Sequence, residues 1–162
     1  MDTKLGLSRI GHVALKVADI GRSLEFYIDR LGFAEMMRLN NDDGSLWLIY
    51  LRITDTQFIE LFTGGQGVRA PGHEATAINH FCLQSDDLDA TAARLRAAGV
   101  KLTVEPKLGL DGNRQCWIED PDGNRIEIME MAPNCIQFEA IRDFHKGKPS
   151  HVLKLYPGQK PA

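Results

Sequence analysis

The chain has 162 residues, of which 43% are hydrophobic and 25% charged, and a formal net charge of −3. No segment approaches the roughly 18 apolar residues of a membrane span, and no apolar segment follows the N-terminal charges. We therefore expect a soluble globular protein without an export signal, and the cytoplasm is its expected location. The lack of a basic block before the tail argues against a nucleic-acid partner, which leaves small molecules.

The three cysteines, Cys82, Cys116 and Cys135, are odd in number and have no metal-type spacing. We therefore expect neither a disulfide framework nor a zinc ribbon. The remaining interpretation is that these cysteines fill the core as small hydrophobic side chains.

The first half of the chain predicts a strand, a helix and three more strands. Residues 9–17 alternate between aliphatic and other residues, which is typical of a half-buried strand, and His12 lies on the face without the branched aliphatics. Asp19 is the expected N-cap of a helix that ends at Gly32. The three strands are predicted near residues 34–39, 46–53 and 57–62.

A segment rich in glycine and proline, residues 64–72, follows and is interpreted as a linker. A phosphate-binding loop is not favoured there, because no Lys-Ser/Thr pair follows. The first pattern then begins again with a strand at residues 79–85 that carries His80, and with a helix capped by Asp86 or Asp87 and ended by Gly99. The last strands are predicted near residues 101–105, 114–118 and 124–131.

The two patterns match as an internal duplication. His80 follows His12 by 68 residues, while Gly99 follows Gly32 and Glu127 follows Glu60 by 67 residues each. Two copies of one unit normally pair their sheets and create a cleft between them. We therefore predict an α+β fold of tandem βαβββ modules whose mixed sheets pair around a cleft that contains a metal.

The predicted organisation has four parts. They are a first module at residues 8–65, a linker at 66–76, a second module at 77–132 and a C-terminal extension at 133–162. The extension lies outside the repeat, and its spacing of apolar residues allows a short amphipathic helix followed by a loose tail.

The turn before the last strand directs attention to Glu127. Residues 121–124, Pro-Asp-Gly-Asn, have the side chains and the backbone freedom of a tight turn. In the strand that follows, Ile126 and Ile128 share one face, so Glu127 points away from the packed side.

Each predicted module has a histidine on its first strand and a glutamate on its last, opposite the aliphatic face. Any one of them alone could be a polar residue on a solvated strand face. Chance would not be expected to repeat the same residue types at matching offsets, so we interpret all four as ligands of one divalent metal ion. These ligands are His12, Glu60, His80 and Glu127. The remaining histidines, His73, His145 and His151, have no partner at the repeat spacing and are expected on the surface or in the tail.

Two imidazoles and two carboxylates suit Zn, Ni, Co, Fe or Mn and do not suit a closed thiolate site. Four protein ligands leave positions open for substrate oxygens, so the metal is expected to be catalytic and to polarise a carbonyl group. A glutamate released from the metal could then remove and return a proton on the neighbouring carbon. Glu127 is the leading candidate for this base, and Glu60 is the alternative.

Several motifs together resemble the vicinal oxygen chelate superfamily. They are Gly-His-Val-Ala-Leu-Lys-Val at 11–17, Ser-Leu-Glu-Phe-Tyr at 23–27, Leu-Gly-Phe at 31–33, Phe-Ile-Glu-Leu at 58–61, Asn-His-Phe at 79–81 and Asp-Pro-Asp-Gly-Asn at 120–124. Over about residues 8–132 the chain is most similar to glyoxalase I (lactoylglutathione lyase), in the glyoxalase–bleomycin resistance protein family. The resemblance implies the same four metal ligands. The chain differs from glyoxalase I at Lys16 and Gly64. At these positions glyoxalase I usually has an arginine and an asparagine that contact glutathione.

The resemblance implies a lyase or isomerase acting on the hemithioacetal of methylglyoxal and a thiol. Two alternatives stay open. The first is another enzyme of the superfamily, such as an epimerase, lyase or dioxygenase, on a different small carbonyl or hydroxy compound. The second is a drug-binding resistance module, a class that generally needs no metal. A homodimer is expected, because each module exposes an open sheet and sheet edges. In this superfamily the metal site forms either within one chain or between two.

Overall fold

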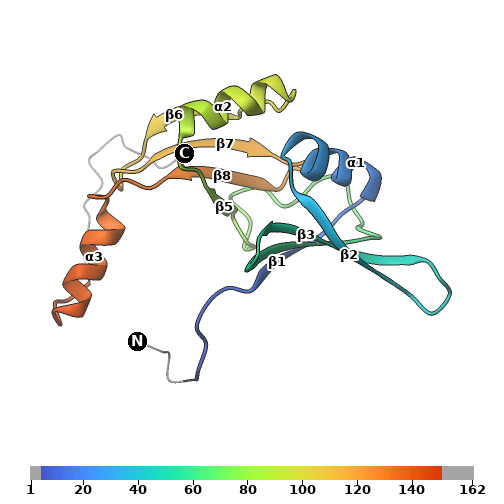
Figure 1. Ribbon diagram of the computed structural model, residues 1–162, viewed down its shortest axis with the longest axis horizontal. Coiled ribbons are helices and arrows are strands. Elements are labelled where there is room, and N and C mark those ends of the chain that lie inside the picture. Colours follow the sequence, from blue (N-terminus) through green and yellow to red (C-terminus); the bar gives the residue numbers. More distant parts are fainter. Residues whose placement is uncertain (1–4, 151–162) are drawn as a thin grey trace.

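The computed structural model describes residues 5–150 and contains two four-stranded mixed sheets, one from each predicted module (Figure 1). The first sheet has the order β1-β4-β3-β2, with β1 at His12–Lys16, β2 at Ala34–Asn40, β3 at Leu46–Thr54 and β4 at Gln57–Phe62. The second has the order β5-β8-β7-β6, with β5 at Phe81–Gln84, β6 at Val104–Leu108, β7 at Arg114–Glu119 and β8 at Arg125–Glu130. The predicted α+β fold of tandem βαβββ modules is confirmed.

A helix follows the first strand of each module, as predicted. In the first module α1, Ile20–Leu24, continues as the π-helical segment η1, Glu25–Arg30. In the second module the helix is α2, Leu88–Ala97. The side chains of Asp19 and Asp87 accept the capping hydrogen bonds of these helices. None of the helices within residues 5–150 is long and apolar enough to cross a membrane.

Two strands of the second module differ from their predicted ranges. β5 begins at Phe81, so His80 lies just before the strand. β6 begins at Val104, three residues later than predicted, and includes Pro106. A proline that cannot donate to a neighbour is tolerated there, because β6 lies at the edge of its sheet and its pairing with β7 is irregular between Val104 and Lys107.

One hydrophobic core joins the two modules. Buried side chains of the first module, such as Tyr27 and Ile59, belong to the same cluster as Ile118 and Ile126 of the second. The aliphatic residues of this cluster thus pack on the helix-covered side of each sheet. We call the opposite side of each sheet its open face.

The Asp-Pro-Asp-Gly turn of the second module is also bound directly by the first module. The Tyr27 hydroxyl donates to Asp120 Oδ2 over 2.9 Å, and the backbone N–H of Ala18 donates to Asp122 Oδ2 over 3.0 Å. A guanidinium nitrogen of Arg22 donates to the Pro121 carbonyl, also over 3.0 Å. These bonds fix the orientation of the two modules.

Replacing Tyr27 by phenylalanine should lower the free energy of unfolding by about 1–2 kcal/mol, because it removes one buried hydrogen bond. Asp120 keeps the donors of Asp122 and Asn124, which limits the loss. Urea unfolding measures it, with Tyr50→Phe as control, since Tyr50 is only half-buried. A loss no larger than that of the control would contradict the prediction.

The same substitution should change the response to alkaline pH. Burial, and then the Asp120 carboxylate, raise the pKa of the Tyr27 phenol well above its usual value. The phenol of the unfolded chain ionises near pH ~10, so the folded state retains a proton that the unfolded state loses, and stability falls above that pH. Tyr27→Phe should flatten this fall.

The C-terminal extension contains α3, Ile136–His145, which confirms the predicted amphipathic helix. Figure 1 shows α3 projecting from the end of the second sheet. His73 and His145 are exposed, as predicted. The remainder of the predicted tail, including His151, lies outside the described residues.

Candidate functional site

The first pair of predicted ligands meets on the open face of the first sheet. β1 and β4 are parallel neighbours, and Ala14 is the register partner of Glu60, so His12 lies diagonally across from Glu60. His12 Nε2 is 3.2 Å from Glu60 Oε2. We call these two residues the first half-site.

The second pair has the same arrangement in the second sheet. Cys82 of β5 is the register partner of Glu127 in β8, and His80 precedes Cys82 by two residues. His80 Nε2 lies 3.3 Å from Glu127 Oε2. His80 and Glu127 form the second half-site, equivalent to the first under the sequence duplication.

The two half-sites do not come together within one chain. Among residues 5–150, no group of three or more His, Cys, Asp or Glu side chains is arranged to hold a metal ion. Within residues 5–150 the chain therefore offers two separate His–Glu pairs.

Both glutamates are buried although they carry charge. Their side chains are 7% exposed for Glu60 and 9% exposed for Glu127, against 47% for His12 and 33% for His80. Within the described part of the chain, neither carboxylate has a lysine or arginine partner. A buried carboxylate without a cation is unfavourable, so the pairs fit a divalent cation that both imidazole and carboxylate could bind.

The neighbouring Asn79 sets the tautomer of His80. Asn79 Nδ2 donates to the His73 carbonyl and its Oδ1 accepts from Arg125, which identifies Oδ1 as the atom 2.8 Å from His80 Nδ1. Because an amide oxygen only accepts, Nδ1 of His80 carries a proton, and Nε2 is the ring nitrogen that lies beside Glu127. A histidine held in this way at Nδ1 has Nε2 as its metal-binding nitrogen.

Trp117 supports the second half-site from β7. It is the register partner of Glu127, and its ring lies 4.7 Å from that of His80 and 4.6 Å from the Arg125 guanidinium carbon. Its indole N–H is buried and finds no acceptor among residues 5–150, a feature that is unfavourable unless another group completes the site. Sequence reasoning did not identify Asn79 or Trp117, although Asn79 adjoins His80 and Trp117 shares the strand alternation.

The prediction that all three cysteines are core residues is wrong for Cys82. Cys116 and Cys135 are buried, whereas Cys82 is exposed. The strand alternation turns Cys82 towards the open face, next to Glu127. Burial of its sulfur, and then the charge of Glu127, raise the pKa of the Cys82 thiol to about 12. Both effects favour the neutral thiol over the thiolate.

A cavity of about 230 Å³ borders the second half-site, between β1 and the start of β5. Its charged or titratable lining residues are Lys16, His80 and Arg125, and no carboxylate lines it. A small pocket with two permanent positive charges suits an anionic group.

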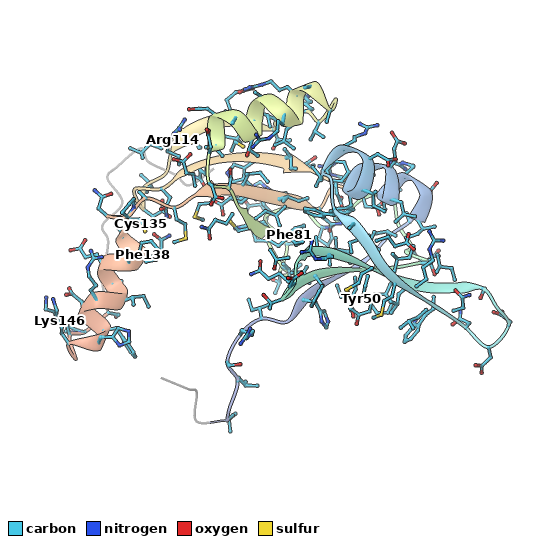
Figure 2. All side chains as sticks on the ribbon, in the orientation of Figure 1. Tyr50, Phe81, Arg114, Cys135, Phe138 and Lys146 are labelled. Atoms are coloured by element: carbon cyan, nitrogen blue, oxygen red, sulfur yellow. The ribbon has the colours of Figure 1, made fainter. Side chains whose placement is uncertain are left out.

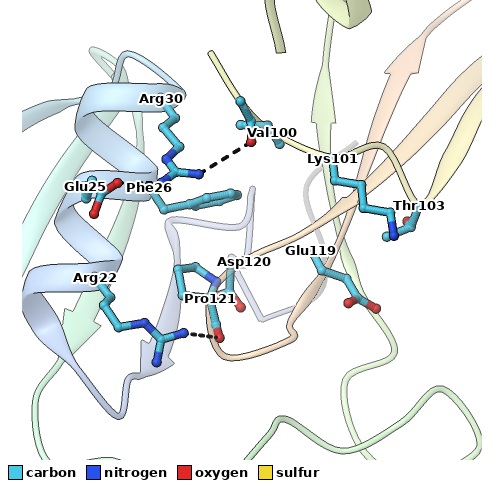
Figure 3. A pocket seen from close by; sticks show the side chains of 11 residues that line it. Arg22, Glu25, Phe26, Arg30, Val100, Lys101, Thr103, Glu119, Asp120 and Pro121 are labelled. Atoms are coloured by element: carbon cyan, nitrogen blue, oxygen red, sulfur yellow. Dashed lines mark hydrogen bonds and ion pairs between the residues drawn. The ribbon is translucent and has the colours of Figure 1, made fainter. Parts of the chain in front are cut away.

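A second cavity, of about 440 Å³, lies on the helix side of the molecule between η1 and the segment after α2 (Figure 3). Its arginines are already bound, since Arg30 pairs with Glu25 and Arg22 donates to the Pro121 carbonyl. None of the four predicted ligands lines it. This cavity is therefore not part of the candidate site.

Comparison with known proteins identifies the family of the chain. The family model of the Glyoxalase/Bleomycin resistance protein/Dioxygenase superfamily matches residues 9–128. Lactoylglutathione lyase of Haemophilus influenzae is 35% identical over 126 residues, covering 75% of this chain and 92% of that protein. An ethylmalonyl-CoA/methylmalonyl-CoA epimerase of Cereibacter sphaeroides is 27% identical over 124 residues, covering 73% of this chain and 92% of that protein.

The fold is also found in solved structures. A crystal structure of lactoylglutathione lyase from Agrobacterium tumefaciens superposes with a TM-score of 0.58 and 26% sequence identity. The superposition covers 76% of this chain and 94% of the other. The family model ends at residue 128, before α3.

Proposed function

Because the chain belongs to the glyoxalase/bleomycin resistance protein/dioxygenase superfamily, we propose that it is a metal-dependent enzyme of the glyoxalase I type. It moves a proton on the carbon next to a carbonyl group of a small substrate. The observation that carries this proposal is the pair of His–Glu half-sites, each with a buried carboxylate that has no lysine or arginine partner among residues 5–150.

The complete site forms between two chains in a homodimer. The open face of the first module of one chain meets the open face of the second module of the other. His12 and Glu60 then lie beside His80 and Glu127 of the second chain. Two-fold symmetry makes two such sites per dimer.

The four residues hold a divalent transition metal, which when bound polarises the substrate carbonyl. Glu127 acts as the general base that removes and returns the proton. Asn79 keeps the His80 Nε2 lone pair available, and Glu60 serves mainly as a ligand. The buried position of Glu127 keeps water away from this carboxylate.

The substrate is the hemithioacetal of methylglyoxal and an anionic thiol. Lys16 and Gly64 lie side by side, since a Cβ atom on Gly64 would be 3.9 Å from Lys16 Nζ. The φ of +77° at Gly64 suits glycine. Lys16 and Arg125 in the 230 Å³ cavity supply the charge that binds a carboxylate of the thiol. Lysine offers a point charge in place of the two-pronged guanidinium of arginine. The proposed substrates therefore include hemithioacetals of thiols other than glutathione.

An epimerase is the second candidate. An epimerase also removes and returns a proton next to a carbonyl, so it needs the same base and the same metal. The differences from glyoxalase I at Lys16 and Gly64 affect only recognition of the thiol. The similarity to an ethylmalonyl-CoA/methylmalonyl-CoA epimerase favours this alternative over a dioxygenase.

A metal and substrate assay tests the proposal. The purified protein should contain close to one divalent metal per chain, lose it and its turnover to a chelator, and regain both with Zn, Ni, Co, Fe or Mn. The panel contains methylglyoxal hemithioacetals of glutathione and of other thiols, together with a branched acyl thioester for the epimerase. Turnover of only the thioester would favour the epimerase. Tight binding of a drug without any metal would contradict both enzymes.

A further inference from the structure

The start of α3 is fixed rigidly to the second module. Asn113, which is 1% exposed, donates to Gln137 Oε1 over 2.9 Å and accepts from the backbone N–H of Ala132 over 2.9 Å. Gln137 in turn donates to the Asp111 carboxylate, and the Ile136 N–H donates to the Asp111 carbonyl. These hydrogen bonds, centred on the buried Asn113, attach the first turn of α3 to the β6–β7 loop.

Helix α3 exposes a stripe of apolar side chains. Phe138, Ile141 and Phe144 recur every three residues and are 41%, 54% and 61% exposed, so exposure increases away from the anchored end. Figure 2 shows Phe138 near the base of α3 and Lys146 at its far end. Three large apolar side chains on a firmly held helix indicate a contact with another surface.

A matching surface lies at the other end of the molecule, on the β2–β3 hairpin. Met37, Leu39 and Trp47 are 41%, 40% and 46% exposed. Met37 and Leu39 are register partners of Tyr50 and Leu48, on the open face of the first sheet. Figure 1 shows the hairpin extending from the molecule on the side opposite α3, so the two surfaces cannot meet within one chain.

The charges beyond the two apolar surfaces are complementary. Arg142 in the last turn of α3 and Lys146 just after the helix have no carboxylate partner within residues 5–150. Asp42 and Asp43 at the hairpin tip have no lysine or arginine partner in the same part of the chain. The apolar stripe of α3 is therefore followed by basic residues, and the apolar surface of the β2–β3 hairpin is followed by acidic ones.

We propose that α3 of one chain packs on the β2–β3 hairpin of a second copy and clasps the dimer. Phe138, Ile141 and Phe144 cover Met37, Leu39 and Trp47, and the basic end of the helix lies at the acidic tip. The proposal rests on the dimer of the proposed function, in which the second module of one chain faces the first module of the other. Two-fold symmetry makes the contact twice.

The dissociation constant of the dimer, measured by sedimentation equilibrium, tests the clasp. Ile141→Ser should raise it about 100-fold, because the symmetric interface loses one large apolar side chain at each of two contacts. Glu139→Ser, an exposed change on the opposite face of α3, is the matched control and should change it less than about twofold. Neither substitution touches the anchoring network, so the unfolding midpoints should agree.

A double substitution tests the identity of the covered surface. Leu39→Ser alone should also weaken the dimer. If the two side chains meet, Leu39→Ser together with Ile141→Ser should weaken it by much less than the product of the two separate factors. Independent, multiplying effects would contradict the contact.

Other outcomes separate the clasp from the proposed function. A wild-type dimer that binds metal and is unaffected by Ile141→Ser would overturn the clasp and leave the proposed function intact. A monomer without metal would overturn both. Binding to phosphatidylglycerol vesicles that Ile141→Ser abolishes, with an unchanged dimer, would assign the stripe to a membrane surface and also overturn the clasp.

Discussion

Replacing Glu127 by glutamine should lower turnover by at least about 100-fold while much of the metal stays bound. The glutamine oxygen can still reach a metal ion, but the amide cannot accept the substrate proton. Because the Glu127 side chain is only 9% exposed, water is poorly placed to replace it as the base. Metal content and turnover are measured on the same sample.

Glu60→Gln is the matched control, since Glu60 occupies the equivalent position of the first module and is 7% exposed. It should reduce turnover less than Glu127→Gln at equal metal content. Full activity of Glu127→Gln with full metal occupancy would contradict its role as the base. Glu60 or a hydroxide would then be the remaining candidate.

The fold was largely predictable because the sequence repeats itself. The offset from His12 to His80 agrees within one residue with that from Glu60 to Glu127, and this repeat was stronger evidence than local secondary-structure preferences. The strand alternation placed both glutamates opposite the core. The π-helical second half of the first helix was not predictable, because π-helical turns are rare and occur as short pieces within helices. The shift of β6 was missed, since Pro106 discourages a strand prediction away from a sheet edge.

Contacts between distant residues account for what the sequence did not reveal. The bond between Tyr27 and Asp120 spans 93 positions in the chain and depends on how the modules pack. Within each module, alternation and register bring one histidine to its glutamate. The distance between the two pairs depends on the packing of the modules, which strand patterns do not specify. The domain boundaries, the four-ligand site and the cytoplasmic location stay predictions.

A mixed dimer tests the shared site most directly. One chain carries His12→Ala and Glu60→Ala, and the other carries His80→Ala and Glu127→Ala. Each variant alone should bind no metal tightly and show no turnover, because each of its sites retains only two ligands. Different affinity tags allow the mixed dimer to be isolated after coexpression.

In the mixed dimer, one site would have all four ligands and the other none. We predict one metal ion per mixed dimer and about half the turnover of the wild-type dimer, as symmetry of two independent sites requires. If each site formed within a single chain, every site of the mixed dimer would still lack two ligands. A mixed dimer that binds no metal and shows no turnover would therefore contradict the shared site.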